Sequence, residues 1–380
     1  MMMFEKYDRN TFDALREQHN IMVLVGNGFD VAMLKKYNIG NLQGKTSSYK
    51  DFYEYIKYFC LCDDNNMLFK RMTDDLSNEN RGENWCDFEE TISELLEDGT
   101  VEITEIEKCV DEFQSYFTRF LNDLVDSSML LKMNADVKEK ALAIQSLSHF
   151  MKDLPDTCDI KFPTTTYHFD LYNFLLVDFC YTPLLDNYMY LDKGQFDPHV
   201  WKNADRHFEF FPETILTSNP TRYSSYLVTD VIHPHGIQDV PRSILFGVDI
   251  PDYNQGTSKE KRLIKSYWSR YDVKYKSYFE ETKLFIMYGM SIAKTDGWWM
   301  DQIFECIINN EAELIIYKYG CENEENIKGK FIQACIRHKN AYGADVEKVK
   351  RHIYVVTFEK NNTFFLGLEK KEYKLTESMS

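Results

Sequence analysis

The first strongly patterned segment is an uninterrupted apolar run from Ile21 to Val25, which ends at Gly26. A short apolar run without polar alternation is typical of a strand buried on both faces, as in a parallel sheet covered by helices. The stretch that follows, residues 29–37, has helical character. These segments predict a strand, a glycine-containing loop and a helix in succession.

Helical patterns dominate about residues 50–150. Ser48 with Asp51 resembles a capping box at the start of the first helix. Two amphipathic segments follow at 101–125 and 135–150, and no strand-like run interrupts them. We therefore predict an all-helical insertion after the first strand–helix unit. Its first helix is indicated by apolar residues at helical spacing, which are Tyr49, Phe52, Tyr53, Ile56 and Phe59.

Strands and helices alternate after Pro163. The strand-like runs are residues 174–177, 227–232, 244–246, 283–288, 313–317 and 353–357. The helical stretches are about 259–282, 296–309 and 323–339. This alternation predicts an α/β fold with a doubly wound, mainly parallel, Rossmann-like sheet. We expect one discontinuous domain over residues 20–380, with the helical insertion at 50–150 within it.

Composition narrows the class of protein. Of the 380 residues, 44% are hydrophobic and 28% charged, which is typical of a globular chain. The formal net charge of −17 makes nucleic acid an unlikely partner, because tracking phosphates usually requires a basic face. A local basic patch remains compatible with this average.

The cysteines and the hydropathy pattern point to the cytoplasm. The nine cysteines are odd in number, irregularly spaced and without a C-x-x-C pair, which argues against a zinc ribbon or redox motif. Residues 1–6 lack the pattern of a signal peptide. No stretch approaches the roughly 18 apolar residues of a membrane span. We expect reduced thiols and a cytoplasmic protein without membrane contact.

The loop Gly26-Asn27-Gly28-Phe29-Asp30 is the first candidate ligand site. A glycine after a buried strand permits a tight turn, and a second glycine lets backbone approach a ligand. Amides at the start of the next helix favour an anion. Val31 occupies the third glycine position of the dinucleotide fingerprint, and Asp30 adds negative charge. A tight turn in which Asp30 caps the helix is the alternative.

Two further segments follow predicted strands. His233 and His235 flank a proline before Gly236, and such a histidine at a strand end is well placed for acid–base work. A metal pair and a loop histidine satisfied by backbone are the alternatives, and no third metal ligand is evident. Gly289 and Ser291 form another strand–glycine–helix junction, with Asp296 beyond it. Two such loops at one sheet edge would face each other across a crevice.

These blocks together resemble the bacteriophage abortive infection family called AbiH. The matching elements run in family order over about residues 21–310. They are the G-N-G-F-D loop at 26–30, S-S-Y-K-D-F at 47–52, Trp85 with Glu89, the block at 179–182, H-P-H-G at 233–236, Phe246-Gly247 and Gly289 through Asp296. The resemblance implies an antiviral defence role against phage.

The layout is also similar to the sirtuin-like NAD-binding fold. That resemblance implies NAD or a related nucleotide as cofactor, no metal, and hydrolysis of NAD in some defence proteins. It makes His235 the catalytic histidine. The implied cofactor-binding residues are Gly26, Asn27, Gly28, Phe29, Asp30, Gly236, Gly289, Ser291 and Asp296.

Cys180 departs from the sirtuin-like pattern, because it stands where an asparagine is expected. An amide positions a water or a ribose hydroxyl through both a donor and an acceptor, and a thiol does so poorly. Cys180 as a nucleophile beside His235 is one interpretation. An offset strand, in which Asn173 or Asp178 takes the polar role, is another.

Three functions follow as hypotheses. The first is an NAD-type nucleotide hydrolase or sensor in phage defence. The second is a non-catalytic nucleotide-binding module whose helical insertion binds a phage or host protein that acts as the trigger. In either case the protein could act as a monomer or as a homo-oligomer. The third is a nuclease, which the net charge and the lack of a recognisable metal-binding acidic motif disfavour.

Overall fold

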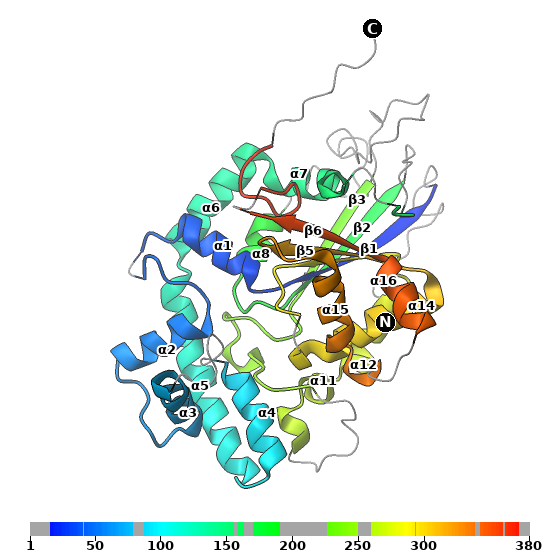
Figure 1. Ribbon diagram of the computed structural model, residues 1–380. Helices are drawn as coiled ribbons and strands as arrows, with labels where there is room; N and C mark the ends of the chain where they lie inside the picture. The colour runs from blue at the N-terminus through cyan, green and yellow to red at the C-terminus, as the bar shows by residue number, and fades with distance from the viewer. Residues whose placement is uncertain are drawn as a thin grey trace.

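Figure 1 shows the computed structural model of the chain. The structure describes residues 16–40, 42–78, 87–155, 159–162, 170–190, 226–249, 260–292, 294–338, 343–359 and 362–371.

A six-stranded sheet forms the centre of the molecule, and all its described pairings are parallel. The strand order is β3-β2-β1-β4-β5-β6, which confirms the predicted doubly wound sheet. The order reverses at β1, which pairs with β2 on one side and β4 on the other. The strands are β1 (Gln18–Val25), β2 (Leu171–Asp178), β3 (Tyr226–Ile232), β4 (Leu284–Tyr288), β5 (Glu313–Tyr319) and β6 (Ile353–Phe358).

The central strands are buried on both faces, as their continuous apolar runs indicate. In β1, Ile21, Val23 and Val25 face one core, whereas Met22 and Leu24 face the other. All five side chains have no exposed surface. Because successive side chains point to opposite faces of a sheet, only a strand covered by helices on both sides needs such a run.

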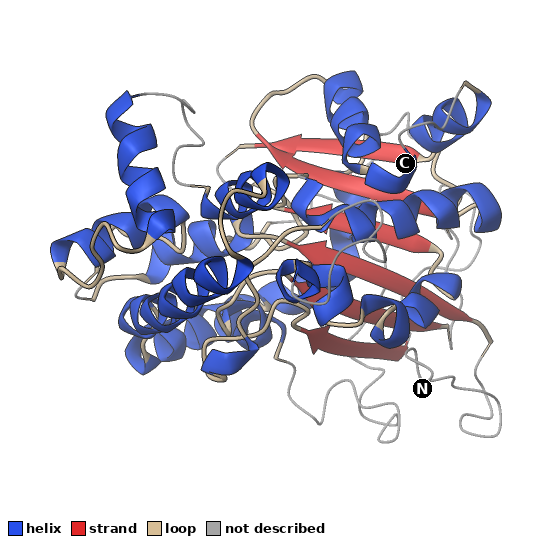
Figure 2. Cartoon of the chain, turned by 90° about the horizontal axis from the view of Figure 1, so that it is seen from below, coloured by secondary structure: helices blue, strands red, loops and turns tan. Residues whose placement is uncertain are grey.

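Helices cover both faces of the sheet (Figures 1 and 2). One core joins the sheet to α1, α6, α7 and α8, and the other joins it to α13, α14, α15 and α16. The helices between β1 and β2 are α1 (Gly28–Tyr37), α2 (Tyr49–Tyr58), α3 (Met67–Asn78), α4 (Phe88–Asp98), α5 (Ile103–Leu124), α6 (Ser127–Lys140) and α7 (Leu142–His149). The later ones are α8 (Leu184–Met189), α11 (Lys265–Trp268), α12 (Tyr271–Lys274), α13 (Lys276–Glu280), α14 (Gly297–Asn310), α15 (Glu324–Ala334) and α16 (Ala344–Arg351).

The described residues between α1 and α7 contain helices and no strand, as predicted for residues 50–150. Ser48 caps α2 by accepting a hydrogen bond from the backbone N–H of Asp51. Helices α2 to α5 lie beyond the sheet edge to which the strand arrowheads point (Figure 2). The division into a discontinuous α/β domain and an inserted helical unit stays a prediction.

Four predicted elements differ from the structure. Residues 244–246 form no strand; this apolar run is a buried loop in which Phe246 packs against Phe88 and Phe117. The helix predicted at 259–282 is broken into short turns, with Arg270 left-handed at φ 53°. The helix predicted at 135–150 is divided into two at Ala141, which also has a φ of 53°. The helix predicted at 323–339 is shorter in the structure, because α15 ends at Ala334.

The loops after β1 and β4 are held together by their backbones. The N–H of Gly26 donates to the carbonyl of Tyr288, and the N–H of Gly28 donates to the carbonyl of Gly289, both at 2.9 Å. A Cβ on Gly28 would lie 2.7 Å from the Cα of Gly289, and Gly289 has a φ of +65°. These glycines are therefore required by the contact between the two loops.

Among the described residues, no helix is both long and apolar enough to pass through a lipid bilayer.

Gly28→Ala should lower the free energy of unfolding by about 1–3 kcal/mol, because the new methyl group overlaps the backbone of Gly289. Gly329→Ala is the matched control, since nothing lies within 4 Å of its Cβ position in α15. It should raise stability by about 0.5–1 kcal/mol. Urea unfolding measures both, and equal effects of the two substitutions would contradict the loop contact.

Candidate functional site

A cavity of about 530 Å³ opens at the carboxyl ends of the strands, where the strand order reverses. Helices contribute Tyr49, Glu89 and Leu121 to its wall. In open parallel sheets this crevice is the usual place for a ligand. Of the residues predicted from sequence, those that line it are Gly26, Asn27, Gly28, Asp30, Cys180, His235, Gly289, Ser291 and Asp296.

Two predicted site residues do not line the cavity. Phe29 is 1% exposed and packs edge-to-face on Tyr188 in the core. Gly236 adopts φ +89° in a turn where a Cβ would lie 2.0 Å from the carbonyl oxygen of Ser243. Both residues shape the loops next to the cavity from outside it.

The start of α1 has few free amides for an anion. The N–H of Gly28 donates to Gly289, and that of Phe29 donates to the carbonyl of Gly26 at 3.0 Å. The hydroxyl of Ser47 donates to the side-chain oxygen of Asn27 at 2.5 Å. The β4 loop thus makes a close backbone approach to Gly28, and the binding of a ligand at this loop stays a prediction.

A buried charge cluster lies against the cavity, and its centre is Lys265. Its Nζ lies 2.9 Å from Oε1 of Glu89 and 3.6 Å from Oδ1 of Asp296. Nε2 of His235 lies 3.3 Å from the same Asp296 oxygen. Glu89 also accepts a hydrogen bond from the N–H of Gly247 at 3.2 Å. Glu89 belongs to the Trp85 block of the family pattern, and Lys265 was not predicted from the sequence.

Burial and neighbouring charges shift the pKa values of Glu89, Asp296 and His235 in different directions. Burial raises the pKa of Glu89 to about 7, although the charge of Lys265 opposes the shift. Burial would also raise the pKa of Asp296, but Lys265 and His235 outweigh it and hold that pKa well below its usual range. Burial and the charge of Lys265 lower the pKa of His235. At neutral pH, His235 is neutral, Asp296 is ionised and Glu89 is poised between its two forms.

Cys180 sits in an acidic environment. The residue is 3% exposed, and its N–H donates to Oδ1 of Asp178 at 2.9 Å. Burial and the charges of Asp178 and Asp30 raise the pKa of the thiol well above its usual value. Because the thiolate is the nucleophile, this environment does not support the interpretation of Cys180 as one.

The polar alternatives to Cys180 lie at opposite ends of β2. Asn173 pairs with Asn20 near the amino end of the sheet, away from the cavity. Asp178 ends the strand beside the site and is fully buried. An offset strand would therefore bring Asp178, and not Asn173, to the ligand.

His233 and His235 have separate partners. Nε2 of His233 lies 3.0 Å from Oδ2 of Asp186, whereas His235 faces Asp296. The residues of this segment are in a turn and not in extended chain, so the two rings do not share a ligand position. A metal pair made by these two histidines is not formed.

Aromatic rings lie around His235. Phe179 packs edge-to-face on His235 with ring centres 5.0 Å apart, and Tyr181 lies tilted at 6.3 Å. Tyr317 and Tyr319 of β5 complete the lining on the other side. Flat apolar walls with a few convergent polar groups suit a planar heterocycle such as a nucleobase.

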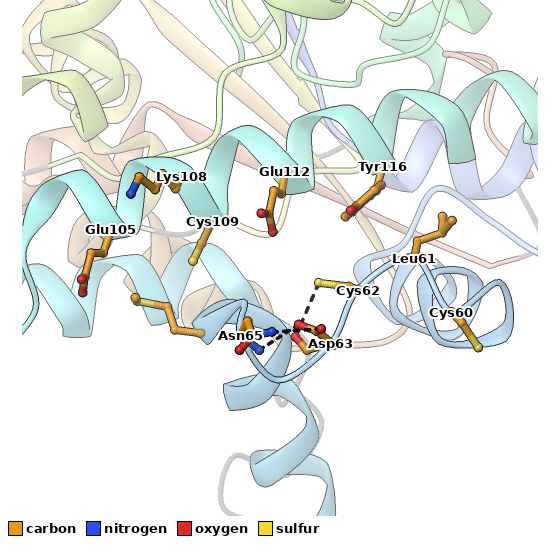
Figure 3. Close-up of a pocket in the computed structure, with 11 residues that line it drawn as sticks. Cys60, Leu61, Cys62, Asp63, Asn65, Glu105, Lys108, Cys109, Glu112 and Tyr116 are labelled. Atoms are coloured by element: carbon orange, nitrogen blue, oxygen red, sulfur yellow. Dashed lines mark hydrogen bonds between the residues drawn. The ribbon is translucent and has the colours of Figure 1, made fainter.

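A second cavity of about 610 Å³ lies in the helical region, among α2, α3 and α5 (Figure 3). Cys60, Cys62 and Cys109 line it. Burial and the charge of Glu112 raise the pKa of Cys62 to about 12, so its thiol stays protonated. This second cavity has carboxyl groups in its lining but no histidine.

The fold and the site define a Rossmann-like α/β protein with a ligand cavity at the reversal of strand order. The chain belongs to the bacteriophage abortive infection AbiH family, whose model matches residues 22–318. The protein is therefore one of abortive infection, a defence against phage. None of the curated proteins compared with the chain matches it. The similarity to sirtuin-like proteins stays a prediction.

The family blocks meet around this cavity. The S-S-Y-K-D-F block supplies Ser47, which holds Asn27, and Tyr49, which lines the wall. The Phe246-Gly247 block supplies the amide bound to Glu89. Trp85 lies outside the described residues. The later blocks bring His235 and Asp296 to one point.

Lys265→Met should lower the free energy of unfolding by about 3–5 kcal/mol, because it leaves Glu89 and Asp296 buried without a counter-charge. Adding Glu89→Gln should restore part of that loss. Lys330→Met, which removes a surface pair with Glu322, is the control and should leave the free energy of unfolding almost unchanged. Additive effects of Lys265→Met and Glu89→Gln in chemical unfolding would rule out the buried pair.

Asp30→Asn should change how stability depends on pH. Burial raises the pKa of Asp30 from 3.8 to about 7, so the folded protein keeps a proton that the unfolded chain loses. The contribution of this group to stability therefore falls as the pH rises from about 4 to about 7. Relative to the wild type, the unfolding free energy of Asp30→Asn should increase over that window. A difference that does not vary with pH in urea unfolding would contradict this assignment.

Proposed function

We propose that the cavity at the sheet edge binds NAD or a related nucleotide, and that the protein hydrolyses its N-glycosidic bond during abortive infection. The observation that carries the proposal is the convergence of His235, Asp296 and Glu89 on one cavity, with His235 3.3 Å from Asp296. Burial and the neighbouring charges lower the pKa values of His235 and Asp296 and raise that of Glu89 to about 7. Titratable groups whose environments push their pKa values apart are typical of acid–base catalysis.

The place and size of the cavity support a nucleotide. The strand order 3-2-1-4-5-6 is that of dinucleotide-binding sheets, and the cavity lies where that order reverses. Its volume of about 530 Å³ falls within the usual range of small-molecule sites. The rings of Phe179, Tyr181 and Tyr317 offer surfaces for a base or a nicotinamide.

The chemistry needs a water and a base. Hydrolysis breaks the bond between the ribose C1′ and the nicotinamide nitrogen, and the bonding electron pair leaves with neutral nicotinamide. The oxygen of the water bonds to C1′, and its proton passes to the neutral imidazole of His235. Asp296 stabilises the imidazolium that results, since its Oδ1 lies 3.3 Å from Nε2. A carboxylate near the sugar stabilises the developing positive charge, which is the role of Glu89 in its ionised form.

The second candidate is a nucleotide-binding module without turnover. Cys180 favours it, because a protonated thiol replaces the amide that would position a water or ribose hydroxyl. The helical region bears on the same site, since Tyr49 and Glu89 belong to its helices and line the cavity. A phage or host protein bound to α2–α5 would then alter the nucleotide site through these two residues.

The test uses the purified full-length protein with NAD and ADP-ribose. Calorimetry should show saturable binding of both, and chromatography should show release of nicotinamide from NAD. His235→Ala should lower turnover by about 10²–10⁴-fold, because it removes the base. His338→Ala is the matched control, since that histidine stacks on Phe304 outside the cavity, and its turnover should equal that of the wild type.

Binding of NAD without nicotinamide release would favour the non-catalytic module over the hydrolase. Absence of binding to both NAD and ADP-ribose would overturn both candidates. In infected cells, hydrolysis predicts a fall in NAD that His235→Ala prevents, and an unchanged NAD level during growth arrest would contradict it.

A further inference from the structure

A second polar cluster lies at the carboxyl ends of β2 and β3, and it is separate from the cluster around Lys265. Asp178 ends β2, Asp186 lies on α8 and His233 follows β3. One donor atom from each of these three side chains lies within 4.8 Å of the other two. Nε2 of His233 is 3.0 Å from Oδ2 of Asp186, and its Nδ1 is 3.8 Å from Oδ2 of Asp178.

Asp178 is the unusual member of this cluster. Its side chain has no exposed surface, and its Oδ2 has no hydrogen-bond partner among the described residues. Asp30, which is also fully buried, adds a second carboxyl group nearby, and its Oδ1 is likewise without a hydrogen-bond partner. An unpartnered buried carboxyl group costs free energy, which a bound proton or a bound cation lowers.

The protein offers little positive charge of its own here. Among the described residues, neither lysine nor arginine forms an ion pair with Asp178, Asp186 or Asp30. The Lys265 cluster differs, because a lysine there compensates the two carboxylates. Among the charged side chains of the described residues, His233 is the one that pairs with Asp178, at a distance too long for a hydrogen bond.

We propose that Asp178, Asp186 and His233 bind a divalent metal ion of the Mn²⁺ or Zn²⁺ type. Two carboxylates and one imidazole are a mixed oxygen and nitrogen donor set that such ions accept. Donors bound about 2.1 Å from a shared octahedral ion lie about 3 Å apart in neighbouring positions. One donor atom from each of Asp178, Asp186 and His233 lies within 4.8 Å of the other two, so side-chain shifts would bring all three onto one ion.

The ion would act on the cavity through Asp178, which holds the cavity-lining residue Cys180 by a hydrogen bond. Oδ1 of Asp178 accepts the N–H of Cys180, and Thr182 donates to Oδ2 of Asp30 at 2.8 Å. Metal bound at Oδ2 of Asp178 would leave both of these hydrogen bonds intact. It would fix the segment from Phe179 to Tyr181 that lines the cavity. The site stands on its own residues and does not depend on the identity of the nucleotide.

The test is a titration of the chelator-treated full-length protein with Mn²⁺ and, separately, Zn²⁺. We expect one ion per chain for at least one of them, with a concentration-dependent rise in melting temperature. Asp186→Asn should weaken binding at least tenfold. Its side chain is 40% exposed, so the variant should keep the fold, which circular dichroism checks. Asp239→Asn, an exposed aspartate nearby in sequence, is the control and should bind as the wild type does.

A second variant tests the nitrogen ligand. With Mn²⁺ bound, pulsed electron paramagnetic resonance should detect a coupled imidazole nitrogen, and His233→Gln should remove that signal. Failure of both ions to bind stoichiometrically would overturn the proposal. Equal affinity of Asp186→Asn and the wild type, or equal weakening by Asp239→Asn, would overturn it too. Each readout is a metal-binding measurement made without nucleotide, so it fails independently of NAD hydrolysis.

Discussion

The backbone contact between the loops after β1 and β4 is the constraint on which the rest of the site depends. Gly28 and Gly289 approach so closely that neither position has room for a side chain. The contact joins the two loops at the point where the sheet reverses its strand order, and both loops line the cavity. His235 and Asp296, which lie 3.3 Å apart, line the same cavity.

The parallel sheet was predictable because its central strands are buried on both faces. A strand that is buried on both faces has a continuous run of apolar residues in its sequence, and this run identifies it. The same logic failed at residues 244–246, since a buried loop packed on Phe88 and Phe117 requires the same three apolar side chains. An apolar run indicates that its residues are buried. It does not show whether their backbone forms hydrogen bonds with a neighbouring strand, and a run of three residues is too short to decide this.

The site was predictable only in part, and for a different reason. The glycine loops and His235 carry local signals, namely a turn or a histidine directly after a strand. Lys265 carries none, because lysine is almost always a surface residue and its burial depends on Glu89, which lies 176 positions away. The contact of Gly28 was not predictable for the same reason, since the atom that excludes its Cβ belongs to Gly289, which lies far along the chain.

The buried ion pair between Glu89 and Lys265 has a consequence for biosynthesis. One wall of the cavity is made early, from the helices after β1, whereas its lysine and Asp296 are translated much later. A ribosome-bound chain that has not yet extended past Lys265 holds Glu89 without its partner, and one that ends before Asp296 lacks a further part of the cavity wall. Chains shortened by premature termination share that defect. The geometry thus delays assembly of the site until both Lys265 and Asp296 have been synthesised.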